Sequence, residues 1–95
     1  MIRVVAHISA RPERIADLEA LLRSLIEPTR KEAGCRRYEL HVNNADPSEF
    51  TFIEEWESDA ALDAHLAAPH LQAAFPRVPE LCMAMPDIRR YTLLA

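Results

Sequence analysis

The sequence has little glycine: Gly34 is the only one in 95 residues. Dinucleotide-binding turns of the G-x-G-x-x-G type and phosphate-binding P-loops need several glycines, because their backbone must approach a phosphate closely. Neither motif is present in this chain. We therefore expect no nicotinamide or nucleotide cofactor bound by either route.

The sequence also lacks the features of an exported or membrane-bound protein. No apolar run approaches the roughly 20 residues of a spanning helix, and residues 1–14 lack the basic start and long apolar core of a secretory signal. Cys35 and Cys82 are the only cysteines and have no C-x-x-C spacing, which is typical of packed free thiols in a reducing compartment. These absences predict a cytoplasmic protein.

The sequence also has no excess of basic over acidic residues. The formal net charge at pH 7 is −4, and charges of both signs are interspersed along the chain. Nucleic acids and anionic membranes attract proteins through basic patches, so we expect neither as a partner. Because 49% of the residues are hydrophobic, the chain can build one core, and its length predicts a single domain over residues 1–95.

The first third of the chain predicts a strand followed by a helix. Alternation over residues 2–9 gives a strand with one wholly apolar face and one mixed face. Between residues 11 and 34, Pro12 fits a first helical turn, Pro28 bends or breaks the helix late, and Gly34 supplies the stop. The apolar stripe of this helix consists of Ile15, Leu18, Leu22, Leu25 and Thr29.

The rest of the chain predicts two paired strands, helical segments and a last strand. Residues 35–43 and 49–57 alternate, and the turn-forming segment between them predicts a hairpin. Ser58 is a good N-cap for a helix over residues 59–68, and Pro69 can start a short helix that ends near Ala74. The prolines of residues 74–81 predict a loop, and residues 87–94 close the chain as a strand.

The order strand, helix, strand, strand, helix, strand is that of the ferredoxin-like split β-α-β fold, an α+β fold with helices on one face of an antiparallel sheet. The other sheet face lacks a cover within the chain. We expect an apolar surface there, built from Ile2, Val4, Ala6, Ile8 and Ile53. Such a surface predicts a homodimer through this sheet face.

Titratable groups gather between residues 50 and 71. His65 shares a helix face with leucines, while Glu54 and Trp56 share the strand face that should meet the helices. A carboxylate aimed at an imidazole fixes its tautomer and raises its basicity, as a general base requires. The alternative is that His65 is a core histidine satisfied by one hydrogen bond. His7 lies on the mixed face of the first strand.

Aromatic and histidine side chains near this cluster have two interpretations. Phe50, Phe52, Trp56 and Phe75 can wall a flat apolar pocket or simply fill the core. His41 and His70 are interpreted as surface or rim residues. His65 and His70 are five residues apart with Pro69 between them, a spacing that does not form an H-E-x-x-H metal site. We therefore expect no bound metal.

Several segments resemble the antibiotic-biosynthesis-monooxygenase (ABM) family, above all its small quinol-monooxygenase-like members. The resemblance implies a dimeric α+β barrel of two ferredoxin-like protomers, each with a pocket between sheet and helices. Trp56 and His65 match the family signature, Glu54 matches the acidic position before the tryptophan, and Tyr38 matches the aromatic after the glycine turn. The segments are VVAHI, EAGCRRYEL, NNADPSEF and FIEEWESDAALDAHLAAPHLQAAF.

The haem-degrading members of the family differ from this chain at three positions. They carry asparagine at the position of His7, tryptophan at that of His65, and an iron-ligating histidine at that of Phe75. Because phenylalanine cannot ligate iron, haem is not expected here.

The resemblance and the residues together predict a cofactor-independent monooxygenase. It would oxidise an electron-rich phenol, hydroquinone or polyketide-like aromatic with O2. His65 is the expected base, Glu54 its orienting partner and His7 a second proton-transfer group. The expected substrate-binding residues are Tyr38, Phe52, Trp56 and Phe75. The alternatives are a non-catalytic small-molecule-binding or stress-response module and a proton-shuttling isomerase on the same fold.

Overall fold

The computed structural model describes residues 1–95. The order of the long elements is that predicted, and none of the helices combines the length and the apolar character that a bilayer crossing requires. The elements are β1 (Ile2–Ser9), η1 (Pro12–Arg14), α1 (Ile15–Ser24), α2 (Ile26–Arg30), β2 (Cys35–Asn43), β3 (Asp46–Trp56), α3 (Asp59–Leu66), α4 (Pro69–Ala74), η2 (Phe75–Arg77), α5 (Val78–Leu81) and β4 (Asp87–Thr92).

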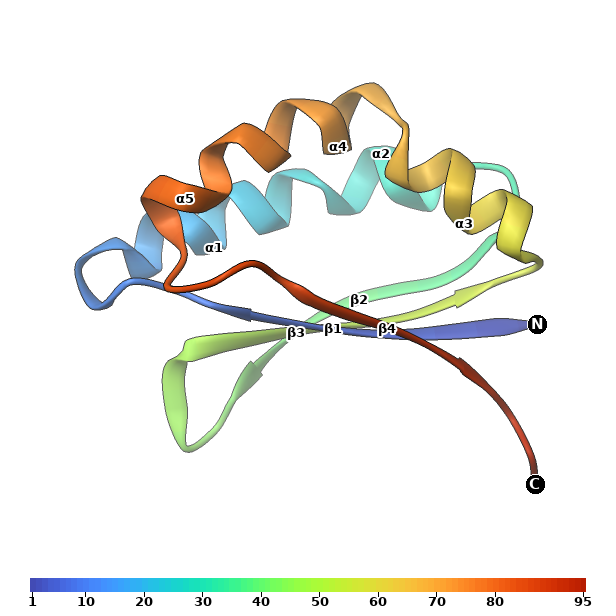
Figure 1. The fold of residues 1–95 in the computed structure, drawn as a ribbon, viewed down its shortest axis with the longest axis horizontal. Helices are drawn as coiled ribbons and strands as arrows, with labels where there is room; N and C mark the ends of the chain where they lie inside the picture. Colours follow the sequence, from blue (N-terminus) through green and yellow to red (C-terminus); the bar gives the residue numbers. More distant parts are fainter.

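The four strands form one antiparallel sheet in the order β2-β3-β1-β4. All helices lie on one face of this sheet, and the other face is bare (Figure 1). The predicted α+β, ferredoxin-like arrangement is therefore confirmed. The register places Val4 of β1 between Glu54 of β3 and Arg90 of β4, so these three residues share the helix-covered face.

The long helix predicted for residues 11–34 is broken into η1, α1 and α2. Leu25 separates α1 from α2, and its N–H bonds to the carbonyl of Leu22. Pro28 explains the break, because it has no N–H to donate to the carbonyl of Ser24. The predicted apolar stripe nevertheless faces the sheet, and Thr29 at its end is fully buried.

The loop predicted for residues 74–81 is wrong. This segment forms η2 and α5, which continue the helical layer after α4. Pro76 and Pro79 lie in the first turns of these two short helices, where the missing N–H would have no helical partner anyway. The prolines thus start helices here rather than interrupt one.

The predicted apolar outer face of the sheet is also wrong. Val4, Ala6 and Ile8 point toward the helices and are at most 6% exposed. Alternation shows which residues share a face of β1, but the most apolar face packs under the helices because that buries the most surface. The bare face, here called the open face, carries Val5 and Ile53 among polar residues. On it, Glu55 of β3 forms ion pairs with Arg3 and Arg37.

Candidate functional site

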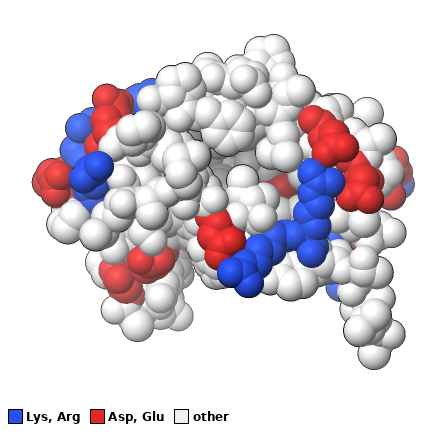
Figure 2. Space-filling model, in the orientation of Figure 1, with Lys and Arg blue, Asp and Glu red and all other residues white.

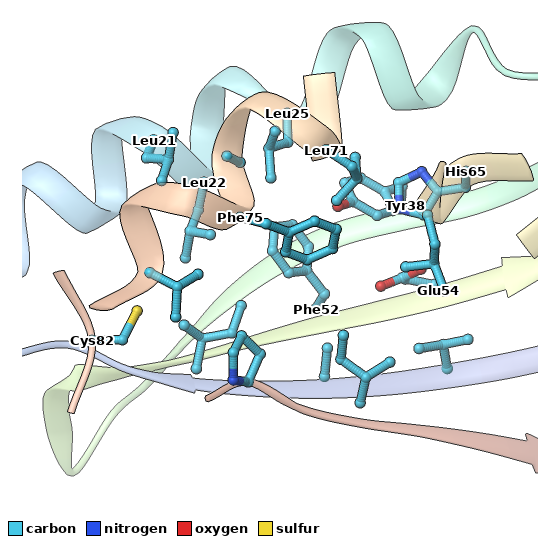
Figure 3. Close-up of a pocket in the computed structure, with 18 of the residues that line it drawn as sticks. Leu21, Leu22, Leu25, Tyr38, Phe52, Glu54, His65, Leu71, Phe75 and Cys82 are labelled. Atoms are coloured by element: carbon cyan, nitrogen blue, oxygen red, sulfur yellow. The ribbon is translucent and has the colours of Figure 1, made fainter. Parts of the chain in front are cut away.

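A cavity of about 60 Å³ lies between the sheet and the helices. Its wall is almost entirely apolar, and Phe75 projects into it from the helical layer (Figure 3). Three side chains with polar atoms, Tyr38, Glu54 and His65, come together at one end (Figure 3). In the space-filling view the molecule is hollowed near its centre, with uncharged residues above the hollow and acidic and basic residues below it and to its right (Figure 2).

His65 is placed by the short helix α3. The Ser58 hydroxyl accepts a hydrogen bond from the backbone N–H of Ala61 and caps this helix at its start. His65 lies in the last turn and is only 2% exposed. Its Nδ1 is 2.7 Å from Oε2 of Glu32, which belongs to the turn between α2 and β2.

This contact sets the protonation of the His65 ring. A carboxylate only accepts hydrogen bonds, so Nδ1 carries the hydrogen and Nε2 is left as the basic nitrogen. Burial lowers the pKa of His65, while the hydrogen bond and charge of Glu32 act in the opposite direction. The lowered pKa keeps the imidazole neutral at pH 7, which is the form that can accept a proton.

Glu54 does not form the predicted bond with His65. Its Oε1 accepts a hydrogen bond from the Trp56 indole Nε1 at 2.8 Å, because residues two apart on a strand point to the same face. Burial raises the pKa of Glu54 to about 7, although the indole bond works against that rise. The structure therefore pairs His65 with Glu32, and leaves Glu54 as a second carboxyl group that changes its charge near neutral pH.

Aromatic rings surround the polar end of the cavity. The ring of Tyr38 stacks on Phe52 with 4.7 Å between centroids, and it meets the His65 ring edge-on at 5.3 Å. Burial, followed by the charge of Glu54, raises the pKa of Tyr38 far above its ordinary value, so its phenol stays protonated. The Trp56 ring packs against the His65 ring, with 4.6 Å between the ring centroids, but Trp56 does not line the cavity.

Five of the seven predicted site residues line the cavity, Trp56 packs behind His65, and His7 lies elsewhere. Tyr38, Phe52, Glu54, His65 and Phe75 all line the cavity. His7 is exposed on the open face and bonds through Nδ1 to Thr51 Oγ1 at 3.0 Å. Side chains alternate along β1, and His7 points to the face opposite to that of the cavity-lining residues of this strand. Within one chain, His7 and His65 therefore lie on opposite sides of the sheet.

Two polar residues beside His65, Glu32 and His70, were not predicted as site residues. Glu32 lies just before the only glycine, and its N–H bonds to the carbonyl of Thr29, which fixes the turn. His70, interpreted as a rim residue, is part-buried, with Nε2 at 3.2 Å from Oε2 of Glu32 and 3.0 Å from Oγ1 of Thr29. The five-residue spacing suggested that His65 and His70 lie far apart on one helix. Pro69 instead starts a new helix, and the two ring centroids are 6.1 Å apart.

Comparison with known proteins gives a family and a fold. The family model described as antibiotic biosynthesis monooxygenase matches residues 1–77. The protein named "Putative monooxygenase Rv0793" of Mycobacterium tuberculosis is 40% identical over 80 residues, which cover 84% of this chain and 78% of that protein. Its solved structure matches with a TM-score of 0.93 at 33% identity, over 99% of this chain and 95% of that chain.

Two further relatives extend this picture. The protein named "Probable quinol monooxygenase YgiN" of Escherichia coli K12 is 36% identical over 84 residues, covering 77% of this chain and 80% of that protein. An uncharacterized protein of Synechocystis is 30% identical over 90 residues, which are 95% of this chain, and the match spans 61% of that longer protein. With its fold and its family match, the chain belongs to the antibiotic-biosynthesis-monooxygenase family.

Proposed function

We propose that this protein is a cofactor-independent monooxygenase that oxidises an electron-rich phenol or hydroquinone with O2. The observation that carries the proposal is the buried His65 at the end of an apolar cavity, with Nδ1 held by a carboxylate and Nε2 left as a base. The E. coli relative is named for a quinol, which supports the substrate class.

The substrate itself supplies the electrons in this reaction. His65 takes the phenolic proton, and the resulting phenolate passes one electron to O2. The two radicals combine at a ring carbon that bears hydrogen, and the peroxide oxygen takes the proton back from His65. His65 then removes the hydrogen from that carbon while the O–O bond breaks, and returns it to the departing hydroxide. One oxygen atom becomes a quinone carbonyl, and the other leaves as water.

The surrounding groups suit these proton transfers. Glu32 stabilises the imidazolium that forms each time His65 takes a proton, because it accepts from Nδ1. The Tyr38 phenol can donate to a substrate oxygen, since it stays protonated at neutral pH. Glu54, with a pKa of about 7, is a second group that can hold a proton. The apolar wall keeps water from the radical pair.

The size of the cavity bears on the substrate. Ligand pockets are commonly several hundred Å³, whereas this cavity is about 60 Å³. A ring can enter only if side chains move, and Phe75 is the large side chain that projects into the space (Figure 3). We therefore propose that single-ring phenols are preferred to polycyclic ones.

Oxygen uptake by metal-stripped protein tests the proposal. We expect acceleration with a panel of hydroquinones and phenols, measured against enzyme-free autoxidation. His65→Ala should lower kcat by roughly 10²–10⁴-fold, because it removes the base. His41→Ala is the matched control, since His41 is exposed on the sheet and lies outside the cavity. If no substrate reacts faster than its autoxidation, or if His65→Ala keeps the wild-type kcat, the oxygenase proposal fails.

A further inference from the structure

Glu32, His65 and His70 form a compact cluster from three separate elements. The potential ligand atoms of this cluster all lie within 4.8 Å of one another. Oε2 of Glu32 lies between the two imidazoles, at 2.7 Å from Nδ1 of His65 and 3.2 Å from Nε2 of His70. The side chains of Glu32 and His70 are 17% and 22% exposed, so the cluster can be reached from solvent.

This cluster is not part of the cavity wall. His65 lines the cavity, whereas Glu32 and His70 do not. The side of the His65 ring that carries Nδ1 faces the cluster, and Nε2 remains for the substrate. His65 therefore belongs to two sites, one through each ring nitrogen.

We propose that Glu32, His65 and His70 bind a divalent transition-metal ion, with Zn²⁺ as the best-suited example, and that the bound ion switches off His65 as a base. The second half of this inference rests on the oxygenase function proposed above, whereas the binding site does not. The ion would lie behind the His65 ring, away from the substrate.

The ligand chemistry fits such an ion. Two imidazole nitrogens and one carboxylate oxygen are a common three-ligand zinc set, with a fourth position left for water. Zinc bonds of about 2.0–2.1 Å place tetrahedral ligand atoms roughly 3.3 Å apart. The two contacts of Glu32, at 2.7 Å and 3.2 Å, are shorter than this separation by about 0.6 Å and 0.1 Å. The Glu32 side chain, which is on a turn, needs only to move aside by a small distance to admit the ion.

Burial also favours the neutral form of His65 that a metal requires. Metal ligands must be unprotonated, and the pKa of His65 is lowered by burial and, to a lesser extent, by His70. Thr29 Oγ1 lies 3.0 Å from the same Nε2 of His70, so the ion would take the place of this hydrogen bond. Arg30 lies near in sequence, but its guanidinium donates to the carbonyl of Tyr38, and both histidines form their ion pairs with Glu32.

Metal binding at Nδ1 would change the tautomer of His65. A neutral imidazole with a metal on Nδ1 carries its hydrogen on Nε2. Nε2, the nitrogen proposed as the base, then donates instead of accepting, and it cannot take a phenolic proton. Metal and substrate turnover are thus mutually exclusive at His65.

The binding site is tested without any substrate. Calorimetric titration of metal-stripped protein with Zn²⁺ should show one ion per chain. His70→Ala and Glu32→Gln should each weaken binding at least tenfold, whereas His41→Ala should not. In ¹⁵N spectra of the histidine rings, Zn²⁺ should shift Nδ1 of His65 and Nε2 of His70. His70→Gln, which keeps a polar group near Thr29, serves if His70→Ala does not fold. Unchanged Zn²⁺ affinity in a folded His70 variant would overturn the site.

The switch is tested by oxygen uptake with and without Zn²⁺. Zn²⁺ should inhibit the wild-type enzyme at concentrations that saturate the site, and the same concentrations should leave the His70 variant active. Equal inhibition of both proteins would overturn the switch, even if the ion binds. If the protein consumes no oxygen at all, the proposed function fails, and the calorimetric result still decides the metal site.

Discussion

The part-buried Glu32 and the buried Glu54, two carboxyl groups near His65, differ in what they bond, and this difference sets their roles. Glu32 accepts from the imidazole, so its charge is compensated whenever His65 is protonated. Glu54 accepts from the neutral indole of Trp56, and its burial raises its pKa to about 7. A charge buried beside a neutral donor is poorly stabilised, whereas a charge beside an imidazolium is stabilised well. Glu32 is therefore the partner expected to matter for the base.

We expect Glu32→Gln to lower kcat by about 10- to 100-fold, the usual effect of losing a carboxylate that orients a functional histidine. Glutamine can still accept a hydrogen bond from Nδ1, but it does not stabilise the imidazolium. Glu54→Gln keeps an acceptor for the Trp56 indole and should cost less. Steady-state oxygen uptake gives the ranking, and a larger loss from Glu54→Gln than from Glu32→Gln contradicts the assignment of partners.

The raised pKa of Glu54 also predicts how stability changes with pH. Its pKa rises from an ordinary 4.5 to about 7, so the folded protein holds this proton more tightly than the unfolded chain. Its contribution to the free energy of unfolding therefore falls as pH rises from about 4.5 to about 7, and stays low above that. Glu54→Gln removes the effect and should be more stable than wild type above pH 7 by up to about 3 kcal/mol.

Urea unfolding of both proteins between about pH 5 and about pH 8 measures this difference. His65, whose lowered pKa costs stability in acid, acts in the opposite direction but is common to both proteins, so it cancels in the comparison. A difference between the two proteins that does not grow with pH in this range contradicts the raised pKa.

At the scale of elements, Gly34 joins the turn after α2 to the end of β3. Its φ is +84°, and its carbonyl accepts the N–H of Glu57. A Cβ at this position would lie 2.7 Å from Cβ of Ala61 in α3. The only glycine is thus needed for the backbone conformation and for the close approach of the helix that carries His65.

Gly34→Ala should lower the free energy of unfolding by about 2–4 kcal/mol, since it combines left-handed strain with overpacking. Ala61→Gly alone should cost about 1 kcal/mol as a helix substitution. The double variant relieves the clash but keeps the strain, so it should lose less than the sum of the two. Urea unfolding of all four proteins completes the cycle, and strictly additive losses contradict a contact between the two positions.

Helices and strands that depend on neighbouring residues were predicted from the sequence. Contacts that depend on how these elements pack together were not. Alternation and the Ser58 cap located β1 and α3, and the helical stripe ending at Thr29 is buried as expected. For β3 the helix-facing side was predicted correctly from Glu54 and Trp56, whereas for β1 alternation did not show which face meets the helices. The pairing of His65 with Glu32 also escaped, because it joins residues 33 positions apart, one in helix α3 and the other in the turn before β2.

At the scale of the whole molecule, the open face and β4 are the surfaces without a cover. β4 is an edge strand that is exposed at all six positions, and Tyr91 on its open side is 47% exposed. The C-terminal tail leaves the sheet on the side away from the helices (Figure 1). Its last leucines, Leu93 and Leu94, are largely exposed. Uncovered edges and apolar tails are unusual on a stable monomer.

We propose that a second copy of the chain covers these surfaces, so that the protein is a homodimer through the open face rather than through Val4 and Ile8. Ile53, at the centre of that face and 36% exposed, is the position to test. Ile53→Glu should shift the dimer toward monomer, because it would bury a charge without a partner. Ala20→Glu, on the exposed surface of α1, is the control and should leave the mass unchanged. Light scattering across a dilution series measures both, and a wild-type protein that stays monomeric when concentrated rules the dimer out.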